Sequence, residues 1–167
     1  MVKMDYLRQI FTSMGFSGVE TFIASGNVIF ESAALPIPAL QTAIADRLHE
    51  TLGYEVATFI RTTADLSEIA RYEPFPAADL EAAGATIYIG FVAQPLSLDA
   101  KQEVMAFRTP VDDFHVHRCE IYWARRIRSS DSKFSLARLE KALGIQATFR
   151  NANTVKKMAA KYAVPEG

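Results

Sequence analysis

The sequence has little of what disulfide chemistry, secretion or membrane insertion would need. Its 167 residues include one cysteine, Cys119, so no internal disulfide can form, and a single thiol fits a reducing compartment. The longest apolar run, residues 85–93, is far short of the roughly 20 residues that span a bilayer. The first residues include no apolar stretch of the secretion-signal type. We therefore expect a cytoplasmic protein with no membrane partner.

Standard catalytic and cofactor signatures are missing as well. The sequence has no glycine-rich phosphate loop of either common spacing, and Ser25 does not lie in a Gly-x-Ser-x-Gly context. His115 and His117 share one face of an expected strand with Asp113, but the remaining histidine, His49, lies on a distant helix. We therefore expect no cofactor and no metal, and the sequence leaves open whether the protein is an enzyme.

What the chain does have is an uneven distribution of charge behind a net charge of −1. From Met1 to His117 there are seven basic and fifteen acidic side chains, whereas from Arg118 to Lys161 there are eleven basic and three acidic ones. A basic region of this kind favours contact with an anionic partner.

Hydrophobic spacing in the first part of the chain predicts two longer helices, a hairpin and a further strand. The expected order is a helix over residues 5–14, strands 19–24 and 27–31 with Ser25-Gly26 at the tip of their hairpin, a helix from Pro38 to Leu52, a strand over 55–62, and a short helix that begins at Thr63.

The second part predicts a similar order with its first strand present. We expect a strand over 85–93, a helix from Ser97 to about Phe107, a hairpin of 113–117 with 120–124, a helix over 133–143, a short strand over 145–149 and a last helix over 151–162.

Superposing the two orders predicts an α+β fold made of duplicated ferredoxin-like (split βαβ) halves. The first half would span residues 1–72, a connection 73–84, and the second half, with an extra terminal helix, 85–167. The first half lacks the opening strand, which lies inside the sheet in this topology. We therefore expect its sheet either to have an unpaired inner gap or to be completed by another segment.

Several motifs resemble those of the DUF1697 family, a bacterial family of unknown function. They are Met4-x-x-Leu7, Leu7 through Gly15-Phe16, Thr21-x-Ile-Ala-Ser-Gly-Asn-Val28, Glu73-Pro-Phe75, Ser132-Lys133 and Thr148-Phe-Arg-Asn-Ala-Asn-Thr-Val155. The resemblance implies a tandem ferredoxin-like α+β architecture and no particular activity. The family pattern has tryptophan where this chain has Ala152, and it opens with an apolar strand and an Arg-Gly-Ile-Asn-Val-Gly-Gly loop that this chain lacks.

The densest polar cluster lies at the start of the last expected helix and comprises Thr148, Arg150, Asn151, Asn153 and Thr154. The free N–H groups and the positive dipole end of a helix start favour an anion such as phosphate. The same residue types also cap helices, and the two roles are compatible.

A second basic cluster follows an expected strand. Arg125, Arg126 and Arg128, with Lys133 beyond them, could hold phosphate oxygens through their guanidinium groups. The alternative is a solvated loop, or one that contacts the acidic part of the same molecule.

These features predict a cytoplasmic protein that binds an anionic ligand, nucleic acid or nucleotide, through its basic C-terminal half. An interaction or regulatory module that contacts a protein partner is the alternative, and a small-molecule enzyme is the third candidate. Tyr88, Tyr122 and Trp123 could stack on bases but lie in core patterns. The candidate anion site consists of Arg125, Arg126, Arg128, Lys133, Arg150, Asn151 and Asn153.

Overall fold

The structure, a computed structural model, describes residues 3–22, 26–33, 36–78, 84–126 and 134–162. By its internal contacts the chain divides into two units, Met1–Ile60 and Arg61–Gly167. Both contain helices and antiparallel strands, so the expected α+β class is confirmed. None of the described helices is both long and apolar enough to cross a membrane.

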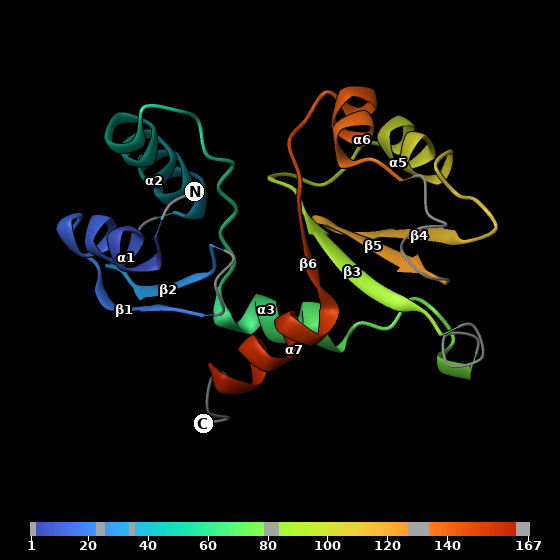
Figure 1. Cartoon of the computed structure of the whole chain (residues 1–167), viewed down its shortest axis with the longest axis horizontal. Coiled ribbons are helices and arrows are strands. Elements are labelled where there is room, and N and C mark those ends of the chain that lie inside the picture. The colour runs from blue at the N-terminus through green and yellow to red at the C-terminus, as the bar shows by residue number, and fades with distance from the viewer. Residues whose placement is uncertain (1–2, 23–25, 34–35, 79–83, 127–133, 163–167) are drawn as a thin grey trace. The chain divides into compact units, whose positions relative to one another are not determined.

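The first unit packs two helices against a two-stranded hairpin (Figure 1). Its elements are α1 (Met4–Ser13), β1 (Ser17–Thr21), β2 (Val28–Glu31) and α2 (Ile37–Leu52). The helices form because their apolar residues recur every three or four positions, and Gly53 ends α2 with a φ of 82° that suits glycine. The buried core comprises Leu7, Ile10, Phe11, Leu40, Ile44 and Leu48.

The hairpin of the first unit pairs as the sequence predicts. β1 and β2 are antiparallel, with Thr21 opposite Val28. Beyond the strands, the N–H of Phe22 donates to the carbonyl oxygen of Asn27 at 3.0 Å, and the Asn27 side-chain amide donates back to the Phe22 carbonyl oxygen at 3.0 Å. The expected tip residue Ser25 lies outside the described residues, so its place at the tip stays a prediction.

The predicted strand over Glu55–Thr62 is wrong, because this segment is neither strand nor helix in the structure. Val56 and Ile60 nevertheless pack against the core of the first unit. The N–H of Ile60 is held by the Gln41 side-chain oxygen at 3.2 Å instead of by a neighbouring strand. Apolar alternation brought the segment onto the core, but a strand also needs a backbone partner, and the described residues of this unit provide none beside it.

The second unit is a four-stranded antiparallel sheet with helices on both faces (Figure 1). Its elements are α3 (Thr63–Arg71), β3 (Thr86–Phe91), α5 (Leu98–Met105), β4 (Asp112–His117), β5 (Glu120–Arg125), α6 (Leu136–Leu143), β6 (Thr148–Asn151) and α7 (Ala152–Lys161). The strand order is β4-β5-β3-β6, so β4 and β6 are the edges. Helices α5 and α6 lie over one face, α3 and α7 over the other.

The face beneath α5 and α6 carries the main apolar core of the second unit. Phe114, Ile121 and Trp123 project from the sheet and meet Val104 of α5 and Leu139 of α6, and all five are buried. Gly90 on β3 leaves room for the Phe149 ring of β6, because a Cβ atom at position 90 would lie 2.6 Å from that ring. The close approach of these residues therefore requires glycine.

The opposite face is tied to α3 by polar contacts at both ends of that helix. Before α3, the Arg61 guanidinium pairs with the buried Glu120 carboxylate at 3.0 Å and donates to the Val92 carbonyl oxygen at 2.8 Å. After α3, the Tyr72 hydroxyl lies 2.7 Å from Nε2 of His115 on β4. Because α3 also packs on α7, these contacts help to position the helix that carries the candidate site.

Candidate anion-binding site

The candidate site begins where edge strand β6 turns directly into α7. Asn151 is the last residue of β6, paired with Tyr88 of β3, and it also caps α7: its side-chain oxygen accepts from the N–H of Asn153 at 2.8 Å. Val155 and Ala159 of α7 are buried, which fixes the helix against the sheet. The capping role expected for this cluster is thus confirmed, and it places the α7 start beside the start of β3.

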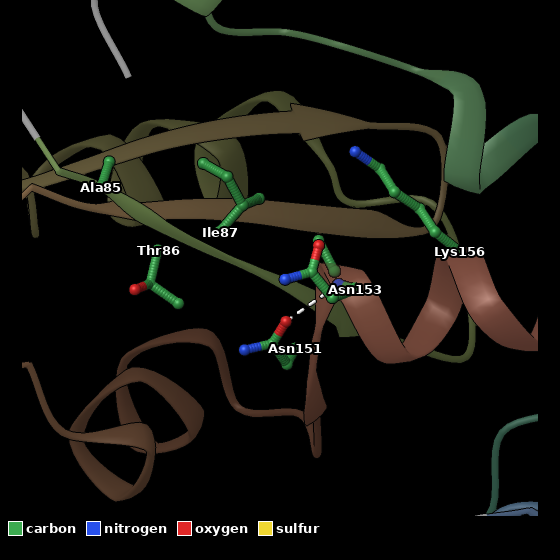
Figure 2. A pocket seen from close by; sticks show the side chains of 7 residues that line it. Ala85, Thr86, Ile87, Asn151, Asn153 and Lys156 are labelled. Atoms are coloured by element: carbon green, nitrogen blue, oxygen red, sulfur yellow. Dashed lines mark hydrogen bonds between the residues drawn. The ribbon is translucent and has the colours of Figure 1, made fainter. Parts of the chain in front are cut away.

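A shallow hollow of about 160 Å³ lies at this junction. Its walls are the start of β3 and the first turns of α7, and its lining residues are Ala85, Thr86, Ile87, Asn151, Ala152, Asn153 and Lys156. Figure 2 shows Asn153 and Lys156 extending from α7 toward the side where Ile87 lies, while Thr86 and Asn151 point to the other side of β3. None of these described lining residues is acidic, so the ammonium group of Lys156 sets the charge of the hollow.

From the hollow, a basic face continues along α7. Asn153, Lys156, Lys157 and Lys161 are exposed at helical spacing, and the sequence of α7 contains no acidic residue. We call Lys156, Lys157 and Lys161 the lysine face. The apolar side chains of α7 point the other way, into the unit.

The two described arginines of the second predicted cluster have partners within the protein. The Arg125 guanidinium donates to the Tyr88 hydroxyl at 2.8 Å and lies over the Tyr88 and Trp123 rings. Arg126 pairs with the Asp113 carboxylate at 3.2 Å. Arg128 and Lys133 lie outside the described residues, so their part in a site stays a prediction.

Arg150 lies on β6 but does not line the hollow. Its Cα is opposite that of Ile89, on the face covered by α3 and α7, and its guanidinium donates to the Phe149 carbonyl oxygen at 3.1 Å. Burial lowers the pKa of this guanidinium from its ordinary value. Of the seven predicted site residues, the hollow therefore brings together Asn151 and Asn153.

The histidine pair on β4 forms an aromatic cluster. His117 stacks on Tyr72 with ring centroids 3.9 Å apart, and the Tyr72 and Tyr122 rings meet in a T-shaped arrangement with centroids 5.3 Å apart. Burial and the neighbouring His117 lower the pKa of His115, while Asp113 acts in the opposite direction. Among the residues that the structure describes, no group of three or more His, Cys, Asp or Glu side chains could hold a metal ion.

Sequence reasoning missed Lys156 and the residues from the start of β3. Lys156 lies three residues after Asn153 on the same expected helix, and this spacing was the signal that could have found it. Thr86 and Ile87 carry no chemical signature, and the pairing of β3 with β6 joins segments about 60 residues apart. A contact of that sequence separation could not be read from local patterns.

Comparison with known proteins now adds the family. The family model described as "Protein of unknown function (DUF1697)" matches residues 1–122. The chain belongs to the DUF1697 family. The matched residues include the β3 wall of the hollow, residues 85–87, and end before the Thr148–Val155 motif that forms its α7 wall. No curated protein matches the chain.

A solved structure of a conserved bacterial protein from Streptococcus pneumoniae is similar in fold. It has a TM-score of 0.72 and 22% sequence identity, and the alignment covers 96% of this chain and 89% of that chain. At this identity the likeness concerns the fold alone.

Proposed function

We propose that this DUF1697 protein binds a phosphate-bearing anion, a nucleotide or a nucleic acid, in the hollow between β3 and α7. The observation that carries the proposal is the α7 wall of the hollow: Lys156 and Asn153 extend to the same side of β3, and none of the described lining residues is acidic. Lysine and side-chain amides donate to phosphate oxygens, and the start of α7 adds a favourable dipole.

The charge of the surroundings supports the same proposal. Lys157 and Lys161 continue the positive charge away from the hollow. On the sheet, Thr86 lies opposite Arg125, whose guanidinium is already positioned by Tyr88. A ligand with several negative charges would therefore meet positive charge beyond the hollow itself.

Titration with inorganic phosphate tests the proposal. Lys156→Ala removes the ammonium group that lines the hollow and should weaken phosphate binding about tenfold, the equivalent of about 1.4 kcal/mol and of one charged hydrogen bond. Lys101→Ala is the matched control, because Lys101 is an exposed lysine on α5. Equal losses in both variants, or no phosphate binding by the unaltered protein, would refute the hollow as a site.

A protein-interaction surface is the second candidate function. On α5, the Leu98 side chain is 73% exposed and Met105, two turns later, is 36% exposed, so both large apolar residues are open to water. Contiguous exposed apolar surface marks sites that contact other proteins, and this second candidate therefore requires Leu98 and Met105 to belong to one patch.

We infer further that the chain follows a duplicated ferredoxin-like plan, with halves at 1–72 and 85–167 joined by residues 73–84. The order β3-α5-β4-β5-α6-β6 and the strand order β4-β5-β3-β6 support a split βαβ arrangement in the second half. In the first half, the order α1-β1-β2-α2 supports the same plan.

A cytoplasmic location is also proposed. It rests on the single cysteine, Cys119, because chains that work in oxidising compartments more often carry paired thiols.

A further inference from the structure

The exposed side of α7 is the most uniformly basic helix face in the described part of the chain. Lys157 and Lys161 are four residues apart and thus project from successive turns of one side, about 6 Å apart along the axis. Two like charges at this spacing repel each other and destabilise an isolated helix by a few tenths of a kcal/mol. The sequence of α7 contains no acidic residue, and the Lys161 ammonium group lies 5.3 Å from the centroid of the Tyr162 ring.

We propose that the lysine face binds the phosphate backbone of a nucleic acid strand, one phosphate of which occupies the hollow at Lys156. This inference rests on the function proposed above and extends it from a single phosphate to a chain of them. Lysines repeated along a helix suit a partner that repeats its charges, because each ammonium group can meet a separate phosphate.

The composition of the face favours a nucleic acid over an acidic protein. The centres of protein interfaces are depleted in lysine and are built around aromatic or large apolar residues. None of the large apolar residues that are exposed in the described chain lies on α7; they are Tyr6, Tyr54, Leu98, Met105 and Ile145. The lysine face thus has the charge of an electrostatic contact and lacks the apolar centre of a protein contact.

Binding of this kind has two measurable consequences. The affinity for a strand falls steeply with salt, because each phosphate contact releases counterions, and the slope of log K against log salt changes by about 0.7 for each contact to a single strand. The affinity also depends little on base sequence, because phosphates carry no sequence information.

The experiment compares two double variants in anisotropy titrations with a fluorescent single-stranded DNA of about 10 nucleotides, at about 50 mM salt and above. Lys157→Ala/Lys161→Ala should weaken binding about fivefold or more and reduce the salt slope by about 1.4, or two contacts. Lys101→Ala/Lys141→Ala removes two exposed lysines from α5 and α6 and should leave both quantities near those of the unaltered protein.

The outcomes separate this inference from the function on which it rests. If the two double variants weaken DNA binding equally, the lysine face is not the DNA-binding surface. The same holds if the unaltered protein binds inorganic phosphate in the hollow but no DNA. In both cases the hollow stays a site for a small anion. If the unaltered protein binds neither phosphate nor DNA, both the hollow and the lysine face are refuted as binding sites. DNA binding that only Lys157→Ala/Lys161→Ala weakens, while phosphate binding is retained, supports the lysine face.

Discussion

Asn151 holds two roles within one residue, as the end of β6 and as the cap of α7. Its backbone pairs with Tyr88, which fixes where the helix begins, and its side-chain oxygen satisfies the N–H of Asn153. The amide nitrogen of the same side chain remains available to the hollow that it lines. Capping and ligand binding therefore use different atoms, and substitutions can separate them.

Asn151→Asp should preserve the cap of α7 but abolish phosphate binding. A carboxylate accepts the same hydrogen bond and suits the positive end of the helix dipole, so the melting temperature should stay level or rise. The new negative charge in the wall should repel phosphate and abolish its binding. Asn151→Ala should instead lower the free energy of unfolding by about 1 kcal/mol. Thermal melts and phosphate titrations of both variants measure the two effects, and unimpaired phosphate binding by Asn151→Asp would argue against the site.

Among the elements, α3 shows how polar contacts hold a helix on a sheet. The Arg61 and Glu120 pair fixes the residue before its start, while Tyr122 donates to the Ile69 carbonyl oxygen at 3.0 Å near its end. Burial raises the pKa of the Glu120 carboxyl, and the Arg61 charge offsets part of that effect. These contacts matter to the site because α7 packs on α3.

The His115 contact with Tyr72 makes the attachment of α3 sensitive to pH. The folded-state pKa of His115 lies below its ordinary value of 6.5, so the unfolded chain takes up a proton first. The contribution of His115 is present above pH 6.5 and should be lost as the pH falls through 6.5 toward the folded-state value. Glu120, with its raised pKa, acts in the opposite sense at lower pH, because its protonation favours the folded state.

Chemical denaturation between pH 7.5 and 5.5 checks this prediction. The free energy of unfolding should fall less steeply with acidification in His115→Gln, whose amide can still bond with the Tyr72 hydroxyl, than in the unaltered protein. Because Glu120 is unchanged in both proteins, the difference between them isolates the histidine. Identical pH dependence in the two proteins would show that His115 titrates alike in the folded and unfolded states.

Helices and strands could be predicted from the sequence where residues next to each other in the chain determine where the element begins and ends. Ser97 caps α5 by accepting from the N–H of Ala100 at 3.1 Å, and Gly144 ends α6 with a φ of 68°. The segment 55–62 failed because a strand depends on a partner elsewhere in the chain.

The candidate site follows the same division. Asn151 and Asn153 could be predicted as site residues, because residues that cap a helix are recognised from the sequence at its start. The contacts of Arg125 with Tyr88 and of Arg126 with Asp113 join different strands, so only the folded sheet shows that these side chains have partners inside the unit.

At the scale of the whole molecule, the structure shows where the basic residues of the C-terminal part lie. Part of the basic C-terminal charge is paired within the second unit, as Arg126 is with Asp113 and Arg118 with Glu68. The lysine face of α7 adds exposed positive charge next to a hollow. We therefore propose that anions bind at the junction of β3 and α7.

The most direct measurement follows the backbone amide signals of the full isotope-labelled chain by NMR while inorganic phosphate is added. We expect the signals that shift to belong to the two walls of the hollow, residues 85–87 at the start of β3 and 151–156 at the start of α7. Lys156→Ala should remove these shifts, while Lys101→Ala should leave them unchanged. Phosphate-induced shifts centred elsewhere in the chain, or shifts at the hollow that persist in Lys156→Ala, would contradict the claim.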